Sequence, residues 1–422
     1  MVRRKSASQP DGLWETVHFD CLHYRGDRPC LAHKRSGCHC AGCGEYHPVT
    51  RRVLMIKLDA MGDVLRTTCL LDGLSKKYRK PQLTWITGRP SLPLLANNPF
   101  VHRVIAYGEE ALATLAAESF DVVINLDSAP RSATLATLAR SDRKIGYVLD
   151  ERGIVRPTGP KSVRWHLMGL FDDLKKSNTR TFQELMCEIL DLDPASCRYV
   201  LELTDEERQF SIEWARTAGL VLEDPSLPPG PIIGLNTGAG GRWKHKRWRS
   251  DGYRELASRL VRQLGAQVIL LGGEEEASEN LRLAESSPPG VMVSGVHPVR
   301  HFAAIVSLCD LVVAGDTLGL HLALALGCRV VALFGPTSAA EIELFGLGEK
   351  LCPELDCLVC YRERCDRTPS CMDLIETSHV LAAIWRVLQG GRGSGAATRA
   401  AAKSPQKAPL PEIGAEAHGL DS

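Results

Sequence analysis

Short apolar runs, each followed by a turn and often by a helix-like stretch, recur along most of this chain and restrict its fold more than any other feature. The first run is residues 53–58, followed by a turn that contains Gly62 and by helical spacing of apolar residues over 64–78. A strand that leads through a glycine-containing turn into a helix is the start of a βα unit. Because the runs are continuously apolar, they indicate parallel strands that are buried on both faces.

The apolar runs form two series, separated by the proline-rich residues 225–231. The predicted strands are 53–58, 83–87, 104–107 and 122–126 in the first series, and 232–235, 268–271, 291–293, 311–313 and 330–334 in the second. Further helices are expected at 161–192, 204–219 and 378–388. The predicted fold class is therefore α/β, with two Rossmann-like doubly wound domains, 51–224 and 225–389, that face a cleft.

Two segments lie outside this α/β body. Residues 1–50 predict a small Cys/His-rich N-terminal module, and residues 390–422, rich in Gly, Ala, Lys and Pro, are expected to be disordered. No apolar leader core and no run of about 18 apolar residues is visible, so we expect a cytoplasmic protein without a transmembrane helix. The net charge of +1, from 51 Lys and Arg against 50 Asp and Glu, excludes a globally basic nucleic-acid-binding protein.

The 15 cysteines are unusual for a chain of this class, because ten of them fall in two clumps. Each clump contains one Cys-x2-Cys pair, a spacing that lets two thiolates reach one tetrahedral metal. The sequence predicts structural zinc, against the alternatives of free loop thiols and, more weakly, an iron–sulfur cluster. The expected ligands are Cys21, Cys30, Cys40 and Cys43 in the first clump and Cys357, Cys360, Cys365 and Cys371 in the second, within residues 352–371. The scattered cysteines are expected to be buried hydrophobic residues: Cys69, Cys187, Cys197, Cys309 and Cys328.

Asp63 stands at the end of the first glycine-containing turn. Ligands of open α/β sheets bind beyond the carboxyl ends of the strands, which makes this an active-site position. A carboxylate here can act as a general base on an incoming hydroxyl. On spacing alone, the simpler role of an N-cap, worth about 1 kcal/mol, is favoured.

The second series opens with a glycine-rich turn over 236–241, which contains Thr237 and lets backbone N–H groups approach a phosphate. A basic and aromatic run with Lys246 follows over 242–249. Glycines and cations that converge on one strand end favour a diphosphate clamp over a nucleic-acid patch or a solvated loop.

Two further strand ends carry polar residues suited to a nucleotide. Glu274 follows the strand 268–271, where an acid can bind ribose hydroxyls or simply stabilise the first turn of a helix. The strand 311–313 leads through Asp316 and Thr317 into a helix whose N-terminus offers free N–H groups to phosphate. Asp316 and Thr317 have the alternative role of helix caps.

With these segments in order, the chain resembles glycosyltransferase family 9, the ADP-heptose:lipopolysaccharide heptosyltransferases. The resemblance spans roughly residues 52–388 and is carried by VLMIKLDAMGDVLRTTCLLDGL, IIGLNTGAGGRWKHKRW, VILLGGEEE and LVVAGDTLGLHLALALGCRVVALFGPT. The stretch DCLHYRGDRPCLAHK is similar to an N-terminal extension found in a subset of such proteins. The resemblance implies a GT-B fold and an inverting transfer that requires no catalytic metal.

The resemblance also implies a role for each candidate. Asp63 corresponds to the family's proposed general base, which raises that role above the N-cap, and Lys246 to the lysine that meets the donor diphosphate. The remaining donor-site residues implied by the resemblance are Glu274 for the ribose and Asp316, Thr317 and His321 in the Asp-Thr-x-x-x-His segment. Thr237, in the glycine-rich turn, and Gly319, two residues after Thr317, are further expected substrate-binding residues.

Two positions depart from the family pattern. Leu318 separates Thr317 from Gly319, whereas many members have Gly directly after the Asp-Thr pair. Asp59 occupies a place where the family often has a small residue, and it could compete with Asp63 as the base.

The implied activity is transfer of a heptose from ADP-heptose to a lipopolysaccharide inner-core acceptor. Because that acceptor is anchored in a membrane, we expect peripheral contact with the cytoplasmic face of the inner membrane. Two alternatives stay open: a transferase that uses another nucleotide sugar, and a metal-stabilised, catalytically inactive nucleotide-binding homologue. A nucleic-acid partner is not expected.

Overall fold

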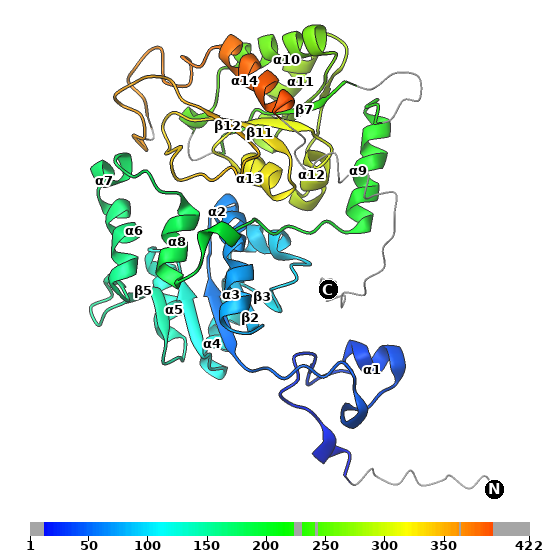
Figure 1. The fold of residues 1–422 in the computed structure, drawn as a ribbon, viewed down its shortest axis with the longest axis vertical. Coiled ribbons are helices and arrows are strands. Elements are labelled where there is room, and N and C mark those ends of the chain that lie inside the picture. Colours follow the sequence, from blue (N-terminus) through cyan, green and yellow to red (C-terminus); the bar gives the residue numbers. More distant parts are fainter. Residues whose placement is uncertain (1–11, 223–229, 241–243, 363, 391–422) are drawn as a thin grey trace, which may run out of the picture.

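The computed structural model describes residues 12–222, 230–240, 244–362 and 364–390 of the chain (Figure 1). These residues form two six-stranded sheets, one in each predicted domain. The predicted boundary at 224/225 and nearly all of the predicted tail lie outside the described residues.

The first sheet has the strand order β3-β2-β1-β4-β5-β6. Its strands are parallel except for the antiparallel pair β5–β6, and β1 is central, with Met55 opposite both Trp85 and Ile124. The strands are β1 Arg52–Ile56, β2 Gln82–Thr87, β3 Arg103–Ala106, β4 Val122–Asn125, β5 Lys144–Leu149 and β6 Val155–Pro157. The apolar runs therefore form buried parallel strands as predicted, whereas β5 and β6 were not predicted.

Helices cover both faces of this sheet and link its strands (Figure 1). They are α2 Met61–Thr67, α3 Leu71–Lys77, α4 Glu109–Ala117, α5 Pro130–Leu138, α6 Pro160–Leu170, α7 Asp172–Lys176 and α8 Phe182–Leu190. The single helix predicted over 64–78 is divided into α2 and α3 by a 3-10 turn, Thr68–Leu70. Threonine hydroxyls compete for backbone carbonyls there, since Thr68 Oγ1 donates to Leu65 O at 2.6 Å.

The second sheet has the strand order β12-β11-β10-β7-β8-β9, and all of its strand pairs are parallel. Its strands are β7 Ile232–Asn236, β8 Gln267–Leu271, β9 Val291–Val293, β10 Leu311–Gly315, β11 Arg329–Leu333 and β12 Gly348–Leu351. The accompanying helices are α10 Ser250–Leu264, α11 Ala277–Glu285, α12 Val299–Val306, α13 Leu318–Ala325 and α14 Thr377–Gln389. A doubly wound sheet is thus present in both domains, entirely parallel in the second and parallel except for β6 in the first.

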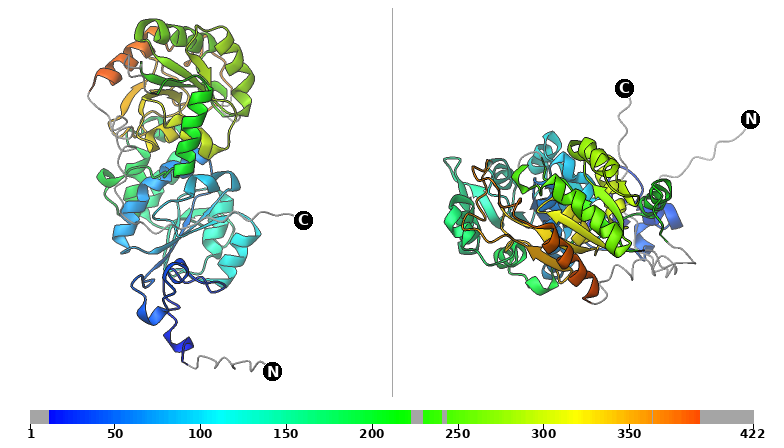
Figure 2. Two further views of the ribbon diagram at one scale, coloured as in Figure 1. Left: turned by 90° about the vertical axis from the view of Figure 1, so that its right-hand side faces the viewer. Right: turned by 90° about the horizontal axis from the view of Figure 1, so that it is seen from above.

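Helix α9, Asp205–Thr217, belongs in space to the second domain, although its sequence position suggested the first. It begins with a capping box, in which the Thr204 hydroxyl and the Glu207 carboxylate each accept the other's backbone N–H. The same Glu207 pairs with Arg300 of α12 at 2.6 Å. Figure 2 shows α9 standing along the side of the second domain.

The N-terminal module lies beneath the first sheet, away from the second domain (Figure 1). Its one α-helix in the described residues is α1, Leu31–Ser36. Between residues 12 and 50, Ala32 is the one buried residue, so this part of the module has no hydrophobic core of its own. Among the helices described, none has the length and apolar character needed to cross a membrane.

Candidate active site

A cleft of about 910 Å³ separates the two domains and is lined by the carboxyl ends of strands from both sheets. The first domain contributes residues after β1 and β4, and the second contributes residues after β7, β8, β10 and β11. This is where open parallel sheets place their ligands.

Asp63 lies on the first-domain wall of this cleft, in the first turn of α2. It is the third residue of the helix, and Ala60 is the N-cap, so the predicted alternative of an Asp N-cap is wrong. The Ala60 N–H donates to Asp63 Oδ2 at 3.3 Å, and Asp63 Oδ1 lies 2.9 Å from Arg66 Nε. The carboxylate, with a side chain 37% exposed, remains open to the cleft.

The charge state of Asp63 follows from its neighbours. Removal from bulk water raises the pKa of this carboxyl, but the positive charges of Arg66 and Lys57 outweigh that effect and lower the pKa to about 2. Asp63 is therefore a carboxylate at neutral pH, which is the form that a general base requires.

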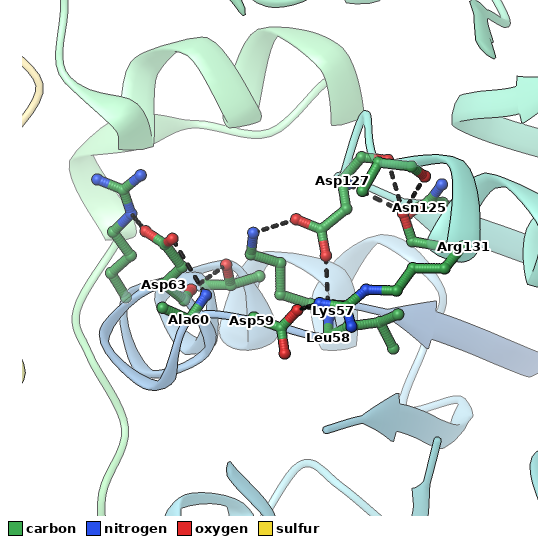
Figure 3. Close-up of polar contacts among 12 residues, drawn as sticks. Lys57, Leu58, Asp59, Ala60, Asp63, Asn125, Asp127 and Arg131 are labelled. Atoms are coloured by element: carbon green, nitrogen blue, oxygen red, sulfur yellow. Dashed lines mark hydrogen bonds and ion pairs between the residues drawn. The ribbon is translucent and has the colours of Figure 1, made fainter. Parts of the chain in front are cut away.

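Two further ion pairs, which the sequence did not predict, lie near Asp63: Lys57 with Asp127, and Asp59 with Arg131 (Figure 3). Lys57, which directly follows β1, pairs with Asp127, which follows β4, and both side chains are largely buried. Asp127 Oδ2 also accepts the Leu58 N–H at 2.9 Å, which ties the two strand ends together. Asp127 follows a predicted strand, so the rule that pointed to Asp63 could have pointed to it as well.

Asp59, the possible competitor for the base role, pairs with Arg131 of α5. Figure 3 shows this pair beside Leu58, with Lys57 extending toward Asp127 and Asp63 lying farther along the turn. Asp63 adjoins the second domain, since its electrostatic neighbours include His321. The geometry therefore favours Asp63 over Asp59 as the base.

The second-domain wall is built around the start of α13. Lys246 Nζ lies 3.1 Å from Asp316 Oδ2 and also donates to the Asp316 carbonyl at 3.2 Å. Removal from water raises the pKa of Asp316, but the positive charge of Lys246 outweighs this effect, so the pKa of Asp316 is lowered overall. Thr317 precedes the helix, and its hydroxyl accepts from Asn236 Nδ2 at 3.1 Å. Each of the three predicted residues here, Lys246, Asp316 and Thr317, lines the cleft.

Gly319 also lines the cleft, in the first turn of α13. A Cβ at this position would collide with Asn236 Oδ1, so a glycine is needed for the helix to approach the end of β7. Leu318 begins α13 without blocking that approach. The helix N-terminus therefore opens onto the cleft despite the departure from the family pattern.

His321, on the next turn of α13, joins the two walls. A Cβ on Gly62 of α2 would lie 2.8 Å from His321 Cδ2, so the domains touch at this glycine. His321 Nδ1 lies 3.4 Å from the Tyr199 hydroxyl, and Nε2 lies 3.9 Å from Asp316 Oδ1. Burial lowers the pKa of His321 to about 4, so the ring is neutral at pH 7.

Two of the predicted substrate-binding residues lie outside the cleft. Thr237 is buried beneath it, where its hydroxyl donates to Asn280 Oδ1 at 2.6 Å, so it supports the glycine-rich turn without lining the cleft. Glu274 is exposed, because the chain turns away after β8 in the 3-10 turn Glu274–Glu276. Glu276 faces the cleft instead and accepts the Gly273 N–H at 2.9 Å.

The basic and aromatic run is not a continuous charged surface in its described part. Trp248 is buried and donates its indole N–H to Ile375 O at 2.9 Å. Arg247 pairs with Glu279, and Arg249 pairs with Asp251 at 3.1 Å. Of these residues, Lys246 is the one that reaches the cleft, as a diphosphate clamp requires.

The clumped cysteines are not assembled into a metal site. In the part of the chain that the structure describes, no three His, Cys, Asp or Glu side chains are arranged to hold a metal ion. Burial, followed by the nearby thiols of Cys360, Cys365 and Cys357, raises the pKa of Cys371 to about 11. In the first clump, Cys38, which was not among the predicted ligands, adjoins Cys43. The zinc sites stay a prediction, and the five scattered cysteines are buried as predicted.

Comparison with known proteins identifies the family of this chain. The family model described as glycosyltransferase family 9 (heptosyltransferase) matches residues 111–367, more than half of the chain. The chain belongs to glycosyltransferase family 9. As a family 9 member it is a glycosyltransferase, and its two Rossmann-like domains around a cleft form the GT-B fold.

Individual relatives of this family 9 chain are distant. It is 24% identical over 311 residues to lipopolysaccharide heptosyltransferase 2 of Escherichia coli K12, covering 68% of this chain and 83% of that protein. Among solved structures, the glycosyl transferase family 9 protein from Veillonella parvula aligns with a TM-score of 0.64 at 19% identity, over 81% of this chain and 98% of the other. E. coli heptosyltransferase WaaC with ADP aligns with a TM-score of 0.53 at 18% identity, over 80% and 98%.

Proposed function

We propose that this protein transfers a heptose from ADP-heptose to a lipopolysaccharide inner-core acceptor, with inversion at the anomeric carbon. The observation that carries the proposal is the pairing of the two cleft walls: an ionised carboxylate, Asp63, faces a cation and a helix N-terminus, Lys246 and α13. The names of the relatives, which are heptosyltransferases, support the choice of sugar and acceptor.

The chemistry assigns one task to each wall. An acceptor hydroxyl attacks the anomeric carbon, its proton passes to Asp63, and the bond from that carbon to the diphosphate oxygen breaks. Because the pKa of Asp63 is low, the proton moves late, once the new C–O bond has made the hydroxyl acidic. Lys246 and the free N–H groups of α13 stabilise the departing diphosphate, and Glu276 is placed for the ribose hydroxyls. These groups supply the charge that a catalytic metal supplies in other transferases.

The acceptor is a lipid-linked saccharide under this proposal, so the enzyme works at the cytoplasmic face of the inner membrane by peripheral contact. With no crossing helix among those described, such contact would be made through a surface.

The experiment is transfer activity with a panel of nucleotide sugars and a lipid A–Kdo type acceptor, accompanied by calorimetric binding of ADP and other nucleoside diphosphates. We expect ADP to bind and ADP-heptose to be the best donor. A higher kcat/KM with another nucleotide sugar would support the alternative donor, and ADP binding without transfer would support an inactive homologue. Failure to bind any nucleoside diphosphate would overturn a transferase function altogether.

A further inference from the structure

One carboxyl that lines the cleft has no role in the transfer chemistry above. Glu341 lies in the loop between β11 and β12, and the residue is 7% exposed. Its backbone oxygen accepts the Phe182 N–H at 2.9 Å, which holds this loop of the second domain against the start of α8 in the first. Its side-chain Oε1 is buried and has no hydrogen-bond partner among the described residues.

An unpaired buried carboxyl oxygen is costly to a fold. Buried polar atoms in native proteins nearly always have a partner, because loss of water is otherwise uncompensated. Because Glu341 lines the cleft, a bound ligand is the natural source of the missing hydrogen bond. Glu341 therefore has the features of a ligand-binding group.

The surroundings of Glu341 indicate which part of a ligand it meets. Burial raises the pKa of its carboxyl, while Arg66 and Lys175 of the first domain act in the opposite direction. The negative charges that reach it are those of Asp316 and Asp63. Glu341 thus lies within electrostatic range of both the diphosphate wall and the base.

In a nucleotide-sugar donor, the anomeric carbon that is attacked carries the diphosphate directly, and the rest of the sugar ring extends from that carbon. Asp316 holds Lys246 for the diphosphate, and Asp63 receives the proton of the acceptor hydroxyl that attacks the anomeric carbon. A cleft-lining side chain within electrostatic range of both Asp316 and Asp63 is placed near the sugar, which carries hydroxyls that both donate and accept hydrogen bonds.

We propose that Glu341 binds hydroxyl groups of the transferred sugar and thereby helps to select which sugar is transferred. This inference rests on the proposed function. A site built to hydrogen-bond a hydroxyl discriminates against analogues that lack it, because its own polar atom is then left unpaired.

The test compares calorimetric affinities for ADP and for ADP-heptose, without acceptor, in the wild-type protein and in Glu341→Ala, Glu341→Gln and Glu343→Gln. Glu343 is the matched control, since it lies on the same loop outside the cleft and accepts the Phe345 N–H at 2.7 Å. We expect Glu341→Ala to weaken ADP-heptose binding about tenfold or more and to change ADP binding by less than about twofold. Glu341→Gln, which keeps a donor and an acceptor, should lie between, and Glu343→Gln should match the wild type.

Thermal melting separates this role from a structural one. Because the unpaired carboxyl is unfavourable, both Glu341 variants should melt at or above the wild-type temperature. Equal effects on ADP and ADP-heptose, or no effect on either, would overturn the inference while leaving the proposed function intact. If the wild-type protein binds ADP-heptose no better than ADP, no sugar contact exists and the inference also fails, whereas absence of ADP binding would refute the proposed function itself.

Discussion

The two walls of the cleft are built on different principles. On the first-domain wall, carboxylates are matched by cations of the same domain: Asp63 by Arg66, Asp127 by Lys57 and Asp59 by Arg131. On the second-domain wall, Lys246 pairs with Asp316, but glycines, a helix N-terminus and the carboxyls of Glu276 and Glu341 make up much of the rest. The first wall has its charges set before a ligand arrives, whereas the second offers groups that a ligand completes.

This difference implies that the walls respond differently to mutation. Changes on the first wall should affect the rate of the chemical step, and changes on the second should affect donor binding.

The largest effect is expected from Asp63→Asn. Without a proton acceptor, kcat should fall by about 10²–10⁴-fold, while the affinity for ADP changes by less than about twofold. Steady-state kinetics and calorimetry provide the two measurements. Asp59→Asn is the control on the same turn and should retain most of the activity, because Asp59 is paired with Arg131. An Asp63→Asn enzyme with normal kcat would refute the base assignment.

The next effect concerns His321, at the junction of the two walls. Its pKa is lowered from 6.5 to about 4 in the folded protein. Between these values the unfolded chain binds the proton and the folded protein does not, so stability falls as the pH decreases from 6.5 toward 4. Across the whole range, this protonation lowers the free energy of unfolding by about 3 kcal/mol. Urea unfolding across this range should show a shallower pH slope in His321→Asn, and parallel slopes would contradict the buried neutral ring.

The smallest effect distinguishes Glu276, which lines the second wall, from its neighbour Glu274, which does not. Glu276→Gln should weaken ADP binding about tenfold, because a charged acceptor for hydroxyls is lost. Glu274→Gln should leave ADP affinity unchanged within about twofold, since Glu274 points away from the cleft. Calorimetry on both variants measures this, and the reverse order would restore the assignment made from sequence.

Sequence patterns predicted the parts of the molecule that depend on local periodicity. Continuous apolar runs identified most strands because buried parallel strands need no alternation. The strand-to-turn-to-helix pattern placed Asp63, Asp316 and Lys246 at the cleft, because the carboxyl ends of parallel strands meet at one edge of a sheet.

Features that depend on side-chain direction could not be predicted in this way. Three consecutive glutamates offer no local signal to show which one faces the cleft, and the 3-10 turn settles that in favour of Glu276. Thr237 lies in the correct turn, but its hydroxyl is directed inward to Asn280. Glu341 lies just beyond the last quoted motif, in a loop without a pattern of its own, and this loop docks on α8.

The position of α9 determines where the second domain can be separated from the first. A fragment that begins at the proline-rich stretch would lack Glu207 and would leave the Arg300 guanidinium, 10% exposed in the intact chain, without its carboxylate partner. It would also uncover the surface of α12 on which α9 packs. A fragment that begins just before Thr204 retains both the capping box and this ion pair, so the second domain with its α9 contacts starts about twenty residues earlier than the composition of the chain suggests.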